Sequence, residues 1–175
     1  MNISEVTLLS KEEYEQYIDN ISIIDEWWWL RSPGRLRKSA VFVYDDGSLG
    51  FSSVSNDSLR VRPALRILNL NSSNLAIKDH FELAGYTWTV ISDEIVLCDD
   101  TIGKCPFRND WNSPDANDYE TSDVKRFLEM WVKDVGLDIE CEQKLPDVNV
   151  ERDVVSLLTD KEEDIITIET DFLPF

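Results

Sequence analysis

The sequence predicts an α+β fold of loop-rich antiparallel strands with two short helices, followed by an acidic C-terminal extension. Short runs of alternating apolar and polar residues lie between clusters of Gly, Pro, Asn and Asp. Helical periodicity is confined to two short segments. Residues 136–175 hold 12 acidic and 3 basic residues, whereas residues 1–135 hold 23 and 14. We therefore predict an α+β domain at 1–135 and an acidic strand-turn extension packed on it at 136–175.

The first predicted helix follows Ser10. Glu13 stands three residues after this serine, which is the spacing of a capping box. Tyr14, Tyr17 and Ile18 would share one face of the helix. The segment Trp27–Ser32 is too short and bulky for a helix of its own and runs into Pro33-Gly34, so it is interpreted as a buried strand or strand-like segment that ends in a turn.

A meander of irregular strands is predicted for residues 27–67. Residues 40–44 are rich in β-forming side chains, Asp46-Gly47 is a hairpin signal, and residues 49–54 alternate. Residues 59–67 also alternate, but Pro63 has no N–H to donate. That strand should therefore lie at a sheet edge or bend at Pro63.

The second half of the predicted domain contains two or three more strands, a long loop and a helix. The strands are expected at 81–83, 86–91 and 95–98, and the loop at 101–120, with Phe107 and Trp111 available to pack it. The helix is expected to begin after Thr121 or Ser122 and to end at Gly136. Its apolar positions follow helical spacing: Val124, Phe127, Leu128, Trp131 and Val135.

The net charge of −18 limits the kinds of partner that the protein is expected to bind. It predicts repulsion from nucleic acid and from anionic membranes, and attraction to basic protein surfaces, although an acidic surface can also serve solubility alone. No apolar run reaches membrane-spanning length and no secretory signal is visible. Cys98, Cys105 and Cys141 lack metal-site spacing and are interpreted as free thiols in a reducing compartment. We therefore expect a cytoplasmic protein.

The sequence offers no catalytic, cofactor-binding or metal-binding set. His80 is the only histidine and has no nucleophile motif beside it. Glycine-rich phosphate loops are absent. Carboxylates occur in pairs at 45/46, 99/100 and 115/118, and a carboxylate-dependent hydrolase or a weak divalent-cation site in residues 110–118 stays open. The basic cluster of Arg31, Arg35, Arg37 and Lys38 is expected to form internal ion pairs. Arg31 is expected to stack on an aromatic ring and to donate to backbone carbonyls or a buried carboxylate.

Several motifs resemble an uncharacterised family found in phages and mobile elements of Gram-positive bacteria. They are "TLLSKEEYEQY", "WWLRSPG" at 28–34, "AVFVYDDGS" and "VRPAL" at 61–65, within a similarity covering about residues 6–135. This resemblance implies a C-type-lectin-like fold in which tryptophans fill the core and their indole N–H groups bind loop carbonyls. The structural core residues that we expect are Trp28, Trp29, Arg31, Trp88 and Trp131.

Three hypotheses for function remain. The first is a non-enzymatic binding protein, phage or prophage encoded, whose acidic surface engages a basic partner. Beside such general protein binding, its sharpest form is an inhibitor of a host nucleic-acid-binding defence protein, such as a nuclease, that mimics nucleic acid (anti-CRISPR or anti-restriction type). Its expected contacts with the basic partner are Asp160, Glu162, Glu163, Asp164, Glu169 and Asp171. The second is a C-type-lectin-like module for receptor or glycan recognition. The third is an enzyme that uses paired carboxylates.

Overall fold

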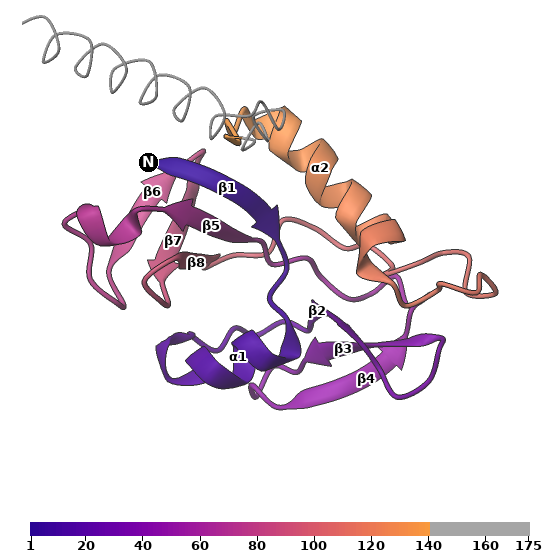
Figure 1. Ribbon diagram of the computed structural model, residues 1–175. Helices are drawn as coiled ribbons and strands as arrows, with labels where there is room; N and C mark the ends of the chain where they lie inside the picture. The colour runs from indigo at the N-terminus through magenta and orange to yellow at the C-terminus, as the bar shows by residue number, and fades with distance from the viewer. Residues whose placement is uncertain (141–175) are drawn as a thin grey trace, which may run out of the picture. The chain divides into compact units, whose positions relative to one another are not determined.

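The computed structural model describes residues 1–140, which form a mixed α+β unit with two antiparallel sheets (Figure 1). A five-stranded sheet has the order β1-β5-β8-β7-β6, and a three-stranded sheet has the order β2-β3-β4. The predicted α+β class is therefore confirmed. The strands are β1 (Asn2–Thr7), β2 (Trp28–Pro33), β3 (Ser39–Val43), β4 (Leu49–Ser53), β5 (Ala64–Leu68), β6 (His80–Leu83), β7 (Tyr86–Val90) and β8 (Ile95–Cys98).

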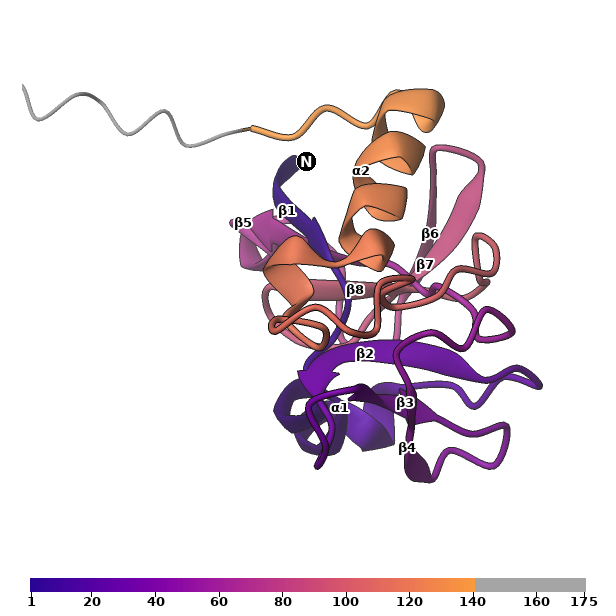
Figure 2. The same cartoon turned by 90° about the vertical axis from the view of Figure 1, so that its right-hand side faces the viewer.

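Two α-helices belong to this unit: α1 (Lys11–Tyr17) and α2 (Asp123–Val135). The predicted capping box of α1 is present, because Ser10 accepts from the Glu13 N–H while the Glu13 carboxylate accepts from the Ser10 N–H. Ser122 caps α2, and Gly136 ends it in a left-handed conformation with φ of 70°. Figures 1 and 2 show α2 lying over the five-stranded sheet and α1 beside the three-stranded sheet.

The adjacent tryptophans of β2 serve two different cores. Because side chains alternate along a strand, Trp28 packs with Tyr14 of α1 in one apolar cluster, while Trp29 packs with Phe107 in the other. Their exposed fractions are 1% and 0%. Trp27 precedes the strand and is 45% exposed, with its ring against Phe42 and Tyr44. One bulky tripeptide thus anchors the three-stranded sheet on both faces.

The strand expected across Pro63 is shorter than predicted. Residues 59–63 form only isolated bridges, through Arg60, and β5 begins at Ala64 directly after the proline. β5 lies inside its sheet, between β1 and β8, so the alternative of an edge position is wrong, and Pro63 stands immediately before the strand. Pro63 ends the irregular segment where its missing N–H costs no ladder bond.

The described unit extends past residue 135. Leu137 and Ile139 pack against the larger apolar cluster, and Ile139 forms a parallel bridge with Ile3 of β1. The Glu140 N–H donates to the Ile3 carbonyl at 2.9 Å. No helix among residues 1–140 has the length and apolar character needed to cross a membrane.

Candidate functional site

The expected core residues occupy different environments. Trp88 is fully buried and Trp131 is 8% exposed, and both rings belong to the larger cluster. The indole N–H of Trp29 donates to the loop carbonyl of Cys105 at 2.8 Å, and that of Trp88 donates to the Leu83 carbonyl at 3.0 Å. Arg31 is only partly buried.

Within residues 1–140 Arg31 lies over no aromatic ring, so the expected stacking is wrong, whereas the expected donation to a backbone carbonyl and a carboxylate is confirmed. Its guanidinium donates to the Leu8 carbonyl and to the Glu13 carboxylate, each at 2.7 Å. The guanidinium over an indole ring is that of Arg62, which lies 5.0 Å from the centre of Trp28. Arg31 therefore ties β2 to the start of α1, and Arg62 takes the position against the aromatic core.

Arg62 is the most deeply buried charged residue among residues 1–140, with 1% of its surface exposed. Its Nε donates to the Cys98 carbonyl at 2.7 Å and its Nη1 to the Ser22 carbonyl at 3.1 Å. Burial lowers the pKa of Arg62 to about 10, so the group is charged at neutral pH. Arg62 thus joins the end of β8 to the segment that leads into β2.

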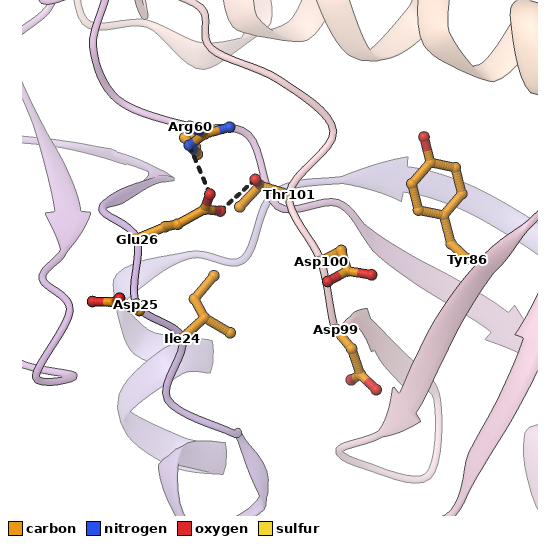
Figure 3. Close-up of a pocket in the computed structure, with 8 residues that line it drawn as sticks. All are labelled: Ile24, Asp25, Glu26, Arg60, Tyr86, Asp99, Asp100 and Thr101. Atoms are coloured by element: carbon orange, nitrogen blue, oxygen red, sulfur yellow. Dashed lines mark hydrogen bonds and ion pairs between the residues drawn. The ribbon is translucent and has the colours of Figure 1, made fainter.

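An open polar pocket lies immediately beyond these two carbonyls, with a volume of about 670 Å³ (Figure 3). The segment after Ser22 supplies Ile24, Asp25 and Glu26, and the chain after Cys98 supplies Asp99, Asp100 and Thr101. Arg60 and Tyr86 complete the lining. Both acidic walls therefore continue directly from the two carbonyls that Arg62 holds.

A single ion pair occupies the centre of this lining. Arg60 Nε lies 2.9 Å from Glu26 Oε1, and the Thr101 hydroxyl donates to the other oxygen of Glu26 (Figure 3). The Arg60 backbone also bonds to Trp27 and Trp29, which fixes it beside the start of β2. Figure 3 shows Asp100 on the Tyr86 side of Glu26, while the Asp25 carboxylate points away from Glu26. Glu26 is thus neutralised, and its acidic neighbours are not.

A second pocket of about 300 Å³ shares Asp25, Glu26 and Arg60 with the first. It adds Trp27, Asp45, Ser58 and Lys104. Within residues 1–140, Asp25, Asp45 and Asp100 form no ion pair. The two pockets together therefore carry an excess of negative charge at an accessible surface.

His80 and Asp99 lie together but do not form a nucleophilic relay. His80 Nδ1 is 3.2 Å from Asp99 Oδ2 and 2.8 Å from the Thr89 hydroxyl, which itself donates to Asp99. A catalytic triad needs the acid and the nucleophile on opposite ring nitrogens. Here both partners use the same nitrogen, and Thr89 is 4% exposed. The arrangement holds β6, β7 and the end of β8 together.

The other reactive groups that the sequence suggested form local hydrogen bonds or are buried. Asp115 accepts from Ser113 and Thr121, and Asp118 caps a short helical turn at 119–121. Burial raises the pKa of the Cys98 and Cys105 thiols to about 11, which keeps both protonated at neutral pH. Among residues 1–140 no group of three or more His, Cys, Asp or Glu side chains could hold a metal ion.

Within residues 1–140 the basic cluster does not form the internal ion pairs that we expected, apart from that of Arg31. Arg35 lies over the Phe51 ring at 5.2 Å, and Lys38 Nζ lies over Trp111 at 3.8 Å and donates to Asn112. Neither side chain, nor that of Arg37, has an ion-pair partner in the described part of the chain. Aromatic contacts therefore replace carboxylates around this cluster.

The six carboxylates expected to contact a partner lie outside the described residues: Asp160, Glu162, Glu163, Asp164, Glu169 and Asp171.

The acidic pocket was not predicted from the sequence, because it is assembled from segments about 75 residues apart. The Asp99-Asp100 pair was the one visible signal. The burial of Arg62 was not predicted either, because an arginine in an alternating run is expected to face solvent.

The geometry defines a mixed α+β domain with an open acidic pocket. Residues 4–69 of this domain match a family described as a domain of unknown function (DUF6273). No curated protein and no solved structure shows significant similarity to the chain. The match runs from β1 through β5 and includes Asp25, Glu26 and Arg60. The opposite wall of the pocket, with Asp99 and Asp100, lies beyond it.

Proposed function

We propose that this chain is a non-enzymatic protein-binding protein that engages a basic surface, and that the acidic pocket receives a lysine or arginine side chain of the partner. The observation that carries this proposal is the set of carboxylates at Asp25, Asp45 and Asp100. Asp25 and Asp100 line the first pocket, Asp25 and Asp45 line the adjoining second one, and none of the three forms an ion pair within residues 1–140. A guanidinium or ammonium group supplies the missing charge and hydrogen-bond donors.

The charge of the whole chain supports the same partner. A net charge of −18 attracts a basic protein over several ångströms and accelerates encounter, with a rate that falls as salt screens the field. The local pocket then provides what a diffuse field lacks, namely a fixed position for one cation. Arg62 holds the two walls, so the pocket is formed before the partner arrives.

A sharper form of the proposal is a phage- or prophage-encoded inhibitor that acts in the host cytoplasm and occupies a nucleic-acid groove on a defence protein such as a nuclease. Carboxylates in the place of phosphates support it, as does the acidic segment 136–175. The motifs at 28–34 and 61–65 and the long loop after β8 support a C-type-lectin-like ancestry. Neighbouring genes from a lysogeny or anti-defence locus would strengthen this form.

The test compares two variants with equal change in charge. Asp25→Asn with Asp100→Asn alters the pocket, whereas Glu129→Gln with Asp134→Asn alters exposed carboxylates of α2. Binding of an arginine-rich peptide to the full chain is followed by fluorescence anisotropy over a salt series. The pocket variant should weaken binding roughly thirtyfold, as expected for about 1 kcal/mol from each of the two carboxylates. The α2 variant should change it less than twofold. Equal losses of affinity in both variants would show that binding depends on the overall negative field, and would refute the pocket as the binding site.

Glycan recognition is a second candidate, and Trp27 favours it. The ring is 45% exposed at the second pocket, beside Asp45, Arg60 and Lys104. An indole face flanked by charged hydrogen-bonding groups suits a sugar ring. A glycan array probed with the full chain and with Trp27→Ala tests it. Signals lost in the variant would support sugar binding, and an array without signals for the unaltered chain would remove this candidate.

A further inference from the structure

The edge strand β4 has an outer hydrogen-bonding ladder that no other strand of residues 1–140 uses. β4 is the outer strand of the three-stranded sheet, with β3 on its other side (Figure 1). Tyr44 and Ser48 begin the ladder, so Gly50 and Ser52 bond to β3, and the backbone groups of Leu49 and Phe51 point outward. Leu49 and Phe51 have no other backbone partner among residues 1–140. Two N–H and two C=O groups are thus available along this edge.

This edge lacks the usual protection against strand pairing. Natural edge strands are commonly blocked by an inward-pointing charge, a proline or a bulge, yet β4 reads Leu-Gly-Phe-Ser-Ser and pairs with β3 in regular register. Phe51 at its centre is 46% exposed. An open, regular edge with an exposed aromatic residue is the kind of edge to which an extended peptide adds.

An apolar groove of about 520 Å³ lies beside the same strand. Phe51, Ser52 and Ser53 line one side, and Arg35, Leu36 and Lys38 of the β2–β3 turn line the other. Leu36 is 72% exposed. The groove therefore offers a place for apolar side chains of a segment that pairs with β4.

The charge around this groove selects the occupant. Arg35, Arg37 and Lys38 stand together without ion-pair partners in residues 1–140, although the chain as a whole is strongly acidic. We propose that β4 and this groove bind an acidic, extended peptide segment of a partner protein, in which carboxylates alternate with apolar residues. The backbone of that segment would extend the sheet, its apolar side chains would contact Phe51 and Leu36, and its carboxylates would pair with the cations.

Two other occupants fit less well. A second copy of the chain joined through β4 would bring its own basic cluster to the same edge, and the like charges would repel each other. Nucleic acid would meet a net charge of −18 and would leave the backbone ladder unused. An acidic strand satisfies both the ladder and the cations. This proposal does not depend on the acidic pocket, which lies on other segments of the domain.

The test uses an eight-residue peptide of alternating glutamate and valine, with a peptide of the same composition but blocked order as control. Amide hydrogen exchange of the full chain is measured by NMR with and without peptide. The Leu49 and Phe51 amides should become at least tenfold more protected, whereas those of Gly50 and Ser52 should change little, because they already bond to β3. Protection at neither outward amide would overturn the proposal.

Two kinds of variant test separately the contribution of the basic side chains and that of the outward backbone groups of β4. Arg35→Gln with Lys38→Gln should weaken alternating-peptide binding about tenfold, while the matched control Lys78→Gln with Lys133→Gln should change it less than twofold. Phe51→Pro removes an outward N–H and should abolish outward-amide protection. Equal weakening in both charge pairs would refute the proposed groove. Tighter binding of an oligothymidylate than of the peptide, or a dimer that protects Leu49 and Phe51 without peptide, would assign the edge to another occupant and refute it as well.

Discussion

Replacing Glu13 with glutamine should remove most of one pH-dependent contribution to stability. The Glu13 carboxylate accepts from Arg31, from Arg66 and from the Ser10 N–H at 2.9 Å. Burial of the carboxyl group opposes its ionisation, but these donors outweigh burial and lower the pKa of Glu13 from 4.5 to about 2. Glutamine keeps the side-chain oxygen that accepts from Ser10, so the variant isolates the charge.

The size of the effect follows from the change in pKa. A fall from 4.5 to about 2 corresponds to about 3 kcal/mol at neutral pH, since one pKa unit is worth ~1.4 kcal/mol. Arg31 and Arg66 are about one quarter exposed, and screening by water reduces the expected contribution to about 2 kcal/mol. Because the folded pKa lies below the unfolded one, this stability is complete above about pH 5. It should be lost as the pH falls from about 4.5 towards 2.

Urea denaturation of the unaltered chain and of Glu13→Gln at pH 7 and at pH 3 measures this contribution. The difference in free energy of unfolding should be about 2 kcal/mol at pH 7 and less than half of that at pH 3. Taking the difference between the two proteins cancels the titration of the other carboxylates. A difference that is the same at both pH values, or that is below about 0.5 kcal/mol at pH 7, would refute the ion-pair reasoning.

Two further predictions concern buried polar contacts. Arg62→Met should lower the free energy of unfolding by about 3–5 kcal/mol in urea denaturation, because the carbonyls of Cys98 and Ser22 lose their charged donor. A loss below about 1 kcal/mol would exclude Arg62 as the brace of the pocket walls. Trp29→Phe should cost about 2–4 kcal/mol, since it leaves a cavity and an unpaired Cys105 carbonyl. Trp27→Phe, at an exposed ring, should cost less than about 1 kcal/mol, and equal losses at Trp27 and Trp29 would contradict the assigned burial.

Local signals explain which parts of the fold were predictable. The capping box at Ser10, the Asp46-Gly47 hairpin and the helix between Ser122 and Gly136 depend on neighbours within a few residues, and all three are present. β1 was missed because its residues gain β structure only by pairing with β5, about 60 residues away. Neither its length nor its mixed pattern marks it as a strand in isolation.

The basic cluster shows why charge composition alone misplaced side chains. Carboxylates outnumber cations about two to one in the chain, so pairing was the expected state for Arg35 and Lys38. Ion pairing requires proximity in the fold, however, and the β2–β3 turn places these residues beside Phe51 and Trp111. The cations that do pair, such as Arg66, lie where strands and helices bring acidic residues together.

The same reasoning explains why the pocket is a property of the whole α+β domain and not of residues 4–69 alone. That segment supplies Glu26 and Arg60, which neutralise each other, whereas the Asp100 carboxylate comes from the chain after β8. Arg62 lies within the segment and reaches across to the Cys98 carbonyl, two residues before Asp100. A basic partner would therefore meet the Asp100 carboxylate together with Asp25 and Asp45 only when β8 is docked. Loosening that contact should weaken binding even if every pocket carboxylate is retained.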